Sequence, residues 1–505
     1  MKIFDGIKVK KNHIHLFIGL VLIFGLYVLP IIIADRYYND DLARSLMGLT
    51  GWNGDGRPLT EELMKLLSGG IPIADISPLP LLISVLILAY TITKYLDANF
   101  TDKSLGIAET LFFSLVIMNP FMLANLSYKY DVLSMIIALC VAFIPFVISY
   151  DACGIKQIII VLIVTVTALS LYQVVICAIC SLVLIDVLLM IIEDRINKKS
   201  ILNYIIGIIF GSLLYKLVIA KIYISRGDWR LDASKVLIGT DENTLMAIKV
   251  NIVQIVSEIS MYLRSIPVCI IVFIAIGVCV SSLFIIKENV LTILNISVMS
   301  RITRALFIVL LPVFLVGVNI IPLALVNGTG SKSRALLSVC VIELYIAIMF
   351  LNLSRKSKVV AECLIIPCVV FFLSYSYSFG NAEKSQKNYE SYLTYNIVSD
   401  IETLNSDDKY NSLSIIGDAP KSQQVRMLTQ KYPQFEEIVP VYIGNDWWTS
   451  GSQLYHYLQY NIVFKEPDSN DIAYVERAKP YVKNSIYSFY CQNDRIIIKF
   501  NSENQ

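Results

Sequence analysis

A succession of apolar stretches, each about as long as a bilayer is thick, constrains this chain more than any motif. A run of about 20 apolar residues can cross the hydrocarbon core as a helix, because a helix satisfies its own backbone hydrogen bonds. Hydrophobic residues make up 56% of the sequence and charged residues 16%, which is unlike a soluble protein. The sequence therefore predicts a polytopic α-helical membrane protein with about eleven transmembrane helices. The predicted spans lie near 16–33, 79–95, 105–118, 132–148, 158–170, 174–192, 201–224, 266–286, 305–325, 335–351 and 359–375.

The basic residues between these spans predict the orientation of the chain. Lysines and arginines in short loops mark the cytoplasmic side of a membrane protein. The first stretch has a basic start but no A-x-A cleavage site, so we expect a retained span with a cytoplasmic N-terminus. An odd number of spans then places the C-terminal region on the opposite side. The basic residues of the predicted cytoplasmic loops are Lys94, Lys103, Lys156, Arg195, Lys198, Lys199, Lys287, Arg301, Arg304, Arg355, Lys356 and Lys358.

We expect two domains, a transmembrane domain over residues 1–378 and an extracytoplasmic domain over residues 379–505. The second part is polar and contains turn-forming segments. Its helix-like stretches at 384–404, 423–430 and 452–460 alternate with strand-like stretches at 413–416, 462–464, 486–490 and 495–500. This alternation predicts a small α/β domain.

Composition also makes three kinds of site improbable. The net charge of +2 gives no case for a nucleic-acid partner, which would usually require a basic face. Most of the ten cysteines lie inside apolar stretches, where they behave as small hydrophobic residues rather than as a disulfide framework. The sequence has only three histidines, so we do not expect a histidine-rich zinc centre.

Two adjacent carboxylates, Asp40 and Asp41, follow the first predicted span within a few residues. Water reaches acids in this position, so keeping them charged costs little, and they lie at the depth of lipid head groups. A carboxylate there can accept the proton of a sugar hydroxyl. The plainer interpretation of the pair is a solvated helix boundary. We expect the loop over residues 35–78 to be the catalytic loop.

The rest of this loop predicts a glycine-rich turn followed by a helix on the membrane surface. The segment from Gly51 to Arg57 is a loop because of its glycines, and Pro58 suits the first turn of a helix. Leucines then recur with helical spacing until Gly69. Such an amphipathic helix lies in the membrane interface. Arg57 either anchors this helix at the head groups or contacts a phosphate.

Two segments together resemble a known family of membrane enzymes. The first runs through Tyr38-Asn39-Asp40-Asp41, Gly51-Trp52 and Gly56-Arg57-Pro58-Leu59. The second runs through Asn119-Pro120-Phe121 and Asn125-Leu126-Ser127-Tyr128-Lys129-Tyr130-Asp131. They resemble loops of the GT-C-fold glycosyltransferases that use polyprenyl-phosphate sugars. The closer likeness is to the serotype-converting O-antigen glucosyltransferases of the Gtr type II family, found in bacteria and their temperate phages.

This resemblance implies transfer of glucose from undecaprenyl-phosphate glucose to a sugar of the lipid-linked O-antigen. The reaction would occur on the periplasmic face of the bacterial inner membrane and would be inverting. Asp40 and Asp41 share the predicted role of general base. The implied partners are the polyprenyl-phosphate sugar, the lipid-linked acceptor and membrane lipid, with no nucleic acid.

A lipid phosphate that leaves as an anion benefits from a nearby cation. We expect Arg57, Lys129 and Arg334 to bind the donor phosphate, although snorkelling at the interface is the plainer role for the last two. A divalent ion, Mg²⁺ or Mn²⁺, held by the acid pair is an alternative. The candidate substrate-binding residues are Tyr38, Trp52, Asn119 and Asp131, of which Asp131 could instead pair with a neighbouring cation. The pair Trp447-Trp448 suits either an acceptor sugar or an interfacial belt.

Two rival functions remain on the sequence alone. A transporter that flips lipid-linked sugars should carry polar residues near the midplane of several spans. Here the spans offer few such residues beyond Asp186 and Lys216. An O-antigen polymerase or ligase also works outside the membrane, but an acidic pair directly after the first span fits it less well.

Overall fold

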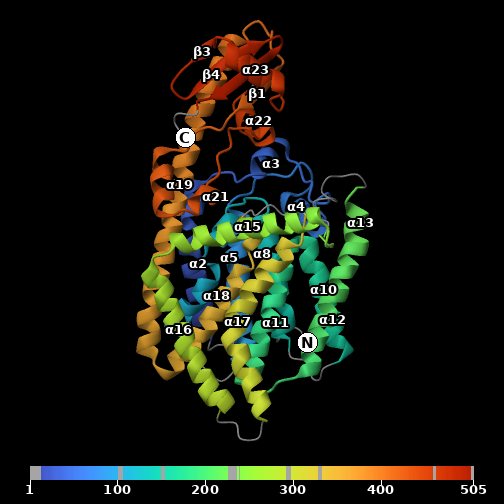
Figure 1. Ribbon diagram of the computed structural model, residues 1–505, viewed down its shortest axis with the longest axis vertical. Helices are drawn as coiled ribbons and strands as arrows, with labels where there is room; N and C mark the ends of the chain where they lie inside the picture. Colours follow the sequence, from blue (N-terminus) through green and yellow to red (C-terminus); the bar gives the residue numbers. More distant parts are fainter. Residues whose placement is uncertain are drawn as a thin grey trace.

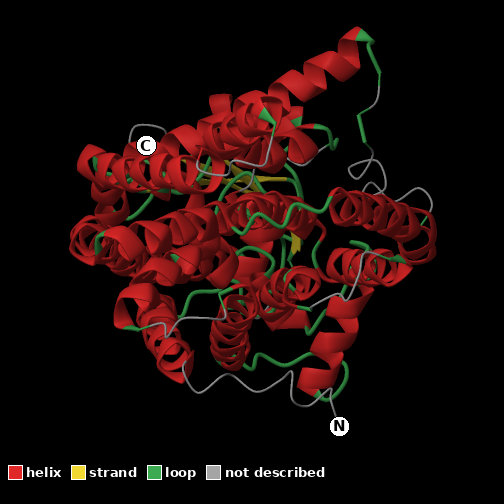
Figure 2. Cartoon of the chain, turned by 90° about the horizontal axis from the view of Figure 1, so that it is seen from below, coloured by secondary structure: helices red, strands yellow, loops and turns green. Residues whose placement is uncertain are grey.

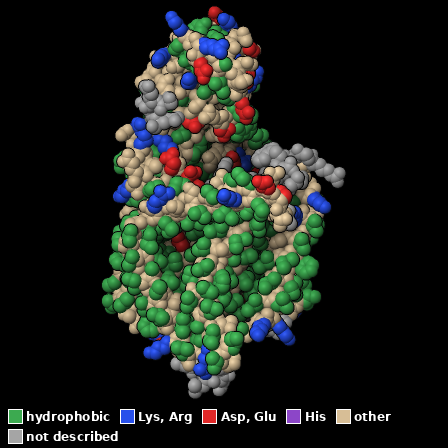
Figure 3. Space-filling model, in the orientation of Figure 1, with side chains coloured by type: hydrophobic (Ala, Val, Ile, Leu, Met, Phe, Trp, Pro, Cys, Tyr) green, Lys and Arg blue, Asp and Glu red, His purple; other side chains and the backbone are tan. Residues whose placement is uncertain are grey.

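The computed structural model describes residues 13–100, 106–148, 154–225, 236–237, 239–291, 297–327, 333–458 and 462–501. Long helices form the lower part of the molecule, and a smaller domain that contains the strands stands above them (Figure 1). Seen end-on, the long helices pack side by side around a shared interior (Figure 2). Hydrophobic side chains cover the visible face of this bundle, whereas charged side chains gather above and below it (Figure 3). This distribution is typical of a multi-pass membrane protein.

Within the described residues, nine helices are long and apolar enough to cross a membrane, or ten if one bent pair counts as a single span. The prediction of a polytopic helical protein is therefore confirmed, but the count of about eleven spans is not. Lys103, one of the predicted cytoplasmic residues, lies outside the described ranges. The nine helices are α2 (Ile14–Ala34), α5 (Leu79–Asn99), α11 (Ile176–Ile192, preceded by η3, Gln173–Val175), α12 (Lys198–Leu214, continued by η4, Tyr215–Ile219, and α13, Ala220–Tyr223), α15 (Glu242–Ser265), α16 (Val268–Ile286, continued by η5, Lys287–Leu291), α17 (Val298–Ala324), α18 (Val339–Lys356, preceded by η6, Ser333–Leu336) and α19 (Lys358–Leu404).

Three predicted spans are broken or short in the structure. The span at 105–118 forms α6 (Ile107–Ser114) and η2 (Leu115–Ile117), and α7 (Pro120–Leu126) follows after a bend of 67°. The bend lies where Pro120 has no N–H to continue the helix and Asn119 caps α7 by accepting a 2.8 Å hydrogen bond from the Met122 N–H. The spans at 132–148 and 158–170 form the shorter helices α8 (Val132–Ala142), α9 (Ile144–Val147) and α10 (Ile155–Leu171).

Helix α15 was missed from the sequence. Its length and composition would allow it to cross a membrane, but it lies across the bundle near the upper end (Figure 1). One side of α15 is open, as at Val253, which is 58% exposed, and the other is buried, as at Glu258. An amphipathic helix in this position is typical of the membrane interface.

The prediction of a small α/β region at the C-terminus is confirmed. Its five-stranded mixed sheet has the order β2-β1-β5-β4-β3. Strand β1 (Ser412–Ile416) pairs in parallel with β2 (Val463–Phe464) and β5 (Arg495–Phe500), and β4 (Tyr487–Gln492) is antiparallel to β5 and β3 (Val482–Lys483). The accompanying helices are α20 (Gln423–Lys431), α21 (Phe435–Ile438), α22 (Trp447–Tyr455) and α23 (Ser469–Arg477).

Helix α19 joins the two parts of the molecule without a break. Its 47 residues begin in the bundle and end beneath the sheet, so the boundary expected at residue 378 falls inside a helix. Leu393 and Ile397, near its upper end, belong to the apolar core of the C-terminal region. The first loop lies at this same upper end of the bundle, because α3 (Asp41–Met47) packs against α22 (Figure 1).

Candidate functional site

The acidic pair lies at the start of the short helix α3. Helix α2 ends at Ala34, and the next residue, Asp35, has a φ of 44° that turns the chain away from the helix axis. Asp40 immediately precedes α3 and Asp41 is its first residue, so their side chains diverge. The Asp40 side chain is 53% exposed, whereas Asp41 is fully buried. The expectation that water reaches both acids is therefore wrong for Asp41.

Asp41 acts as an acceptor for backbone groups of its own loop and of the segment before α8. Its Oδ2 accepts hydrogen bonds from the N–H of Lys129 (2.7 Å) and of Tyr38 (3.2 Å), and its Oδ1 accepts one from the N–H of Tyr130 (3.4 Å). These bonds replace the water that burial removes. Burial raises the pKa of Asp41 to about 8, although the backbone N–H groups act in the opposite direction. Asp41 therefore holds together the two segments on which the family resemblance rests.

Asp40 faces an arginine from a distant part of the chain. Its Oδ2 lies 3.5 Å from Nη1 of Arg334, which belongs to η6. The same Nη1 donates a 2.6 Å hydrogen bond to the hydroxyl of Tyr128, and the Asn39 side chain donates another to that hydroxyl at 3.0 Å. The Arg334 side chain is 26% exposed, so both this guanidinium and the Asp40 carboxylate are partly accessible to solvent.

Asp131 is the buried anion of the site. Its Oδ1 accepts a 2.7 Å hydrogen bond from the indole N–H of Trp52 and lies 3.8 Å from Nη1 of Arg57. Its Oδ2 lies 3.5 Å from Nε of Arg44. Of the two roles considered for Asp131, the structure shows the pairing with cations. Because Asp131 is 3% exposed, it neutralises arginines rather than facing a substrate directly.

Trp52 does not have the open ring face that stacking on a sugar requires. It is fully buried, and the Arg44 guanidinium lies 3.9 Å from its ring centroid. The indole N–H donates to Asp131, and the substrate contact of Trp52 stays a prediction. The burial arises because the glycine-rich loop folds back on helix α4 (Pro58–Ser68), where Glu61 accepts a 3.0 Å hydrogen bond from the Asn53 N–H.

Helix α4 has the start and end that the sequence predicts. Pro58 is its first residue, and Gly69 ends it with a φ of +72°. Its outward residues include Leu59, 41% exposed, and Leu66, 79% exposed. Exposed leucines on a helix at the end of the bundle favour contact with lipid head groups and upper acyl chains.

Arg57 reaches the Asp131 cluster from the start of α4 and is connected to Arg334. Its Nε donates a 2.8 Å hydrogen bond to the side chain of Gln173, and its guanidinium lies 4.8 Å from the ring centroid of Tyr172. The Tyr172 hydroxyl donates a 3.1 Å hydrogen bond to the carbonyl of Arg334. Tyr172 therefore contacts the Arg57 guanidinium and the backbone of Arg334 at the same time.

The third predicted phosphate ligand, Lys129, is placed differently. Its ammonium pairs with Asp35, lies 3.9 Å from Asp75 and lies 4.3 Å from the ring centroid of Tyr37. Two carboxylates thus compensate its charge, whereas Arg334 has a single neighbouring acid within 4 Å among the described residues. Arg334 is the better placed cation for a second anion.

Two other predicted substrate residues are buried and have structural partners. The Tyr38 hydroxyl donates a 3.1 Å hydrogen bond to the carbonyl of Ile438, in the C-terminal region. Asn119 caps α7 and its carbonyl accepts a 3.2 Å hydrogen bond from the Tyr27 hydroxyl. Neither side chain is exposed, so both would act on a substrate only through the backbone that they position.

The C-terminal region holds the start of the first loop through a buried ionic cluster. Arg36 donates hydrogen bonds to Glu383 (3.0 Å), Glu390 (2.7 Å) and the carbonyl of Pro440 (2.6 Å), and it lies over the ring of Tyr442. Both carboxylates come from α19. The loop that carries Asp40 is therefore fixed against the C-terminal region as well as against the bundle.

Sequence reasoning missed Arg44, Tyr172 and Gln173 as members of this site. A signal was present for the last two, because a polar residue interrupts the apolar run from 158 to 192 at the division between α10 and α11. Arg44 lies four residues after Asp40, about one helical turn, and therefore on the same face of α3 as Asp40. Nothing in the sequence pairs Arg44 with Asp131.

The acid pair does not fit the alternative of a chelated Mg²⁺ or Mn²⁺. A divalent ion needs several oxygen ligands that point to one position. Asp41 instead faces backbone N–H groups and Asp40 faces Arg334. Over the described part of the chain, no group of three or more His, Cys, Asp or Glu side chains could hold a metal ion.

Replacing Asp41 with Leu is expected to lower the free energy of unfolding by about 1–3 kcal/mol, because the N–H groups of Lys129 and Tyr38 would be buried without an acceptor. Thermal unfolding in detergent would measure this loss. The matched change Asp40→Leu should leave the unfolding temperature nearly unchanged, since that side chain is exposed. Equal unfolding temperatures for wild type and Asp41→Leu would contradict the structural role.

The raised pKa of Asp41 adds a pH dependence to this test. Because the folded-state value of about 8 exceeds the unfolded value of 3.8, the proton-linked stabilisation is complete below the unfolded pKa. It is lost as pH rises through the folded pKa. The unfolding temperature of wild type should therefore fall from about pH 4 to about pH 8 relative to Asp41→Asn, which cannot ionise, and should fall no further above that pH.

Comparisons with known proteins cover the segments that form this site. The family described as "Glucosyl transferase GtrII" matches residues 29–351, which include the residues of both loops. The chain is 36% identical over 231 residues to a Salmonella phage P22 protein named "Uncharacterized 55.3 kDa protein in gtrB 5'region". That alignment covers 44% of this chain and 45% of the phage protein, so the chain spans less than half the length of this curated relative. No solved structure matches the chain significantly, so the GT-C-like architecture stays a prediction.

Proposed function

The chain belongs to the GtrII glucosyl transferase family, and from this membership we propose that it transfers glucose from a polyprenyl-phosphate carrier to a lipid-linked O-antigen sugar. In this proposal the reaction takes place at the upper end of the bundle, on the periplasmic face of the bacterial inner membrane. Family membership favours sugar transfer over the rival function of a flippase. The observation that carries the proposal is the exposed Asp40 carboxylate 3.5 Å from the Arg334 guanidinium.

Asp40 is the general base in this mechanism. The acceptor hydroxyl attacks the anomeric carbon of the donor from the face opposite the phosphate, which inverts the configuration. Asp40 accepts the hydroxyl proton as the new C–O bond forms. Asp41 is a positioning residue, because its oxygens are buried among backbone N–H groups and do not reach the site.

Arg334 stabilises the leaving group in the same step. The bond between the anomeric carbon and the phosphate oxygen breaks, and negative charge grows on the lipid phosphate. The Arg334 guanidinium, fixed by Tyr128, supplies a planar donor for two phosphate oxygens. Arg57 adds positive charge from the Asp131 side, and Asp131 keeps that guanidinium in place.

The acceptor approaches from the C-terminal region in this proposal. Helix α22 lies directly above α3 and farther from the membrane bundle than α15 (Figure 1). Its first two residues, Trp447 and Trp448, are 39% and 45% exposed. This distance from the interface supports a sugar-facing role for the pair over an interfacial belt.

Analysis of surface polysaccharide tests the proposed function directly. A bacterium that lacks this protein is compared with the same strain expressing it, and the O-antigen is analysed for composition and linkage. We expect one new glucosyl side branch per repeat, because a transferase of this class modifies a lipid-linked glycan before its delivery to the surface. An unchanged polysaccharide in a strain that makes both the donor lipid and the acceptor would refute the proposal.

A further inference from the structure

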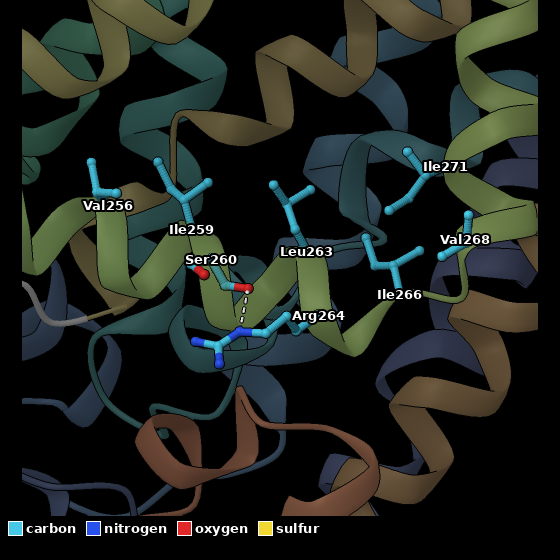
Figure 4. A pocket seen from close by; sticks show the side chains of 8 residues that line it. All are labelled: Val256, Ile259, Ser260, Leu263, Arg264, Ile266, Val268 and Ile271. Carbon is cyan, nitrogen blue, oxygen red and sulfur yellow. Dashed lines mark hydrogen bonds between the residues drawn. The ribbon is translucent and has the colours of Figure 1, made fainter.

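A pocket of about 510 Å³ lies between α15 and the beginning of α16, outside the cluster formed by Asp40, Arg334 and Asp131. Branched apolar side chains from both helices line it, among them Ile259 and Leu263 of α15 and Val268 of α16 (Figure 4). We call this pocket the α15 groove. Its size and apolar lining suit a hydrocarbon chain.

One cation lies at the rim of the α15 groove. Arg264 donates a 3.3 Å hydrogen bond to the carbonyl of Ser260 on its own helix, and no carboxylate of the described residues pairs with it. Ser260 and Arg264 lie along one edge of α15, whereas Val256, Ile259 and Leu263 project from the opposite edge (Figure 4). A groove with an apolar side and one uncompensated guanidinium fits an amphiphile with a hydrocarbon chain and a phosphate.

The buried face of α15 connects the groove to the candidate site. Glu258 accepts hydrogen bonds from the hydroxyl of Ser333 (2.6 Å) and the side-chain amide of Gln434 (2.9 Å). Ser333 immediately precedes Arg334 in η6. Arg264 follows Glu258 by six residues, a rise of about 9 Å along the helix. Helix α15 therefore carries Arg264 at the rim of the groove and also hydrogen-bonds Ser333, the residue before Arg334.

We propose that the α15 groove is the docking site for the isoprenoid chain of the lipid-phosphate carrier, with Arg264 binding its phosphate as the lipid enters from the bilayer. This inference rests on the proposed function, because it names where that function's donor docks. A polyprenyl phosphate is favoured over a general phospholipid because α15, which lines the groove, also hydrogen-bonds Ser333, the residue before Arg334. The head group then passes around α15 to Arg334, where transfer takes place.

Two variants of the full-length purified protein test the groove. Ile259→Trp fills it, and Arg264→Gln removes its cation without changing its apolar lining. Binding of sugar-free polyprenyl phosphate is measured by titration with native mass spectrometry in detergent, a readout that the introduced tryptophan does not affect. We expect each variant to bind about tenfold more weakly, because it loses either a buried hydrocarbon contact or a charge-assisted hydrogen bond. The matched control is Val253→Trp, on the same helix but outside the groove and 58% exposed, which should bind as wild type does.

Transfer kinetics separate docking from catalysis. Both groove variants should raise KM for a long-chain donor about tenfold and leave kcat unchanged, since the reacting groups are intact. For Ile259→Trp, a short-chain donor analogue should remove the difference from wild type, because it does not need the groove. A structural defect would instead lower kcat with both donors.

Three outcomes overturn the proposal. Unchanged binding in both variants would show that the groove does not take the lipid. Equal competition by phosphatidylglycerol would show a general phospholipid site. A chain-length-independent effect of Ile259→Trp would show disturbed folding rather than lost docking. Binding of the sugar-free lipid requires no transfer, so the two proposals are tested separately. A wild-type protein that transfers no sugar would refute the proposed function. Unchanged lipid binding in the variants, together with normal transfer, would refute only the groove.

Discussion

Asp40→Asn is expected to lower kcat for sugar transfer by about 10²–10⁴-fold, the range that a general base contributes. The amide has nearly the shape of the carboxylate but cannot accept the proton of the acceptor hydroxyl. Because the Asp40 side chain is exposed, the change should leave the amount of inserted protein and its unfolding temperature unaltered. Initial rates with purified polyprenyl-phosphate glucose and native acceptor would measure the effect.

The most informative control for Asp40→Asn is its neighbour. Asp41→Asn keeps one oxygen acceptor for the backbone N–H groups and removes no proton acceptor that a substrate can reach. It should therefore retain far more of the transfer rate than Asp40→Asn. The reverse order of activities would assign the base to Asp41 and would require its loop to open.

Arg334→Gln is expected to reduce kcat by about 10²–10³-fold, as removal of a preorganised charge-stabilising donor does. The developing charge on the lipid phosphate would lose its nearest open cation. Arg334→Lys should recover only part of the loss, because an ammonium cannot bind two phosphate oxygens in one plane. Single-turnover rates at saturating donor would measure this effect apart from lipid binding.

Arg57→Gln serves as the comparison for Arg334→Gln. Arg57 is already held by Asp131 and Gln173, so its loss should cost less in kcat than the loss of Arg334. If Arg57→Gln proved the more damaging change, the leaving phosphate would have to bind on the Asp131 side of the site. Comparable rates for wild type and Arg334→Gln would exclude Arg334 from leaving-group stabilisation.

The parts of the fold that local chemistry determines could be predicted from the sequence. Pro58 and Gly69 set the ends of α4, and short apolar runs matched strands such as β1 and β5. Helix α15 could not be assigned this way, because its charged residues, among them Glu258 and Arg264, weaken its apolar signal. Packing against other elements decides whether such a helix crosses a membrane or lies along it. A hydropathy window along the sequence does not include those elements.

The sequence could predict which segments form the candidate site, but not which of their side chains contact one another. Asp40 and Asp41 look alike in the sequence, and the segment at Lys129, 88 residues away from Asp41, decides which of them is buried. Arg334 was a candidate cation, but its approach to Asp40 depends on Tyr128. An exposed sugar contact is a natural prediction for Trp52, because its indole partner, Asp131, lies 79 residues farther along the chain.

Under the proposed function, the unbroken helix α19 has a consequence for which part of a lipid-linked glycan is modified. A helix of 47 residues is a rod about 70 Å long. Since its lower part is a membrane span and its upper part supports the sheet, the rod sets the height of the C-terminal region above the lipid. A glycan tethered to a lipid of the same membrane would then present only the units close to its anchor at that height, so those units would receive the branch.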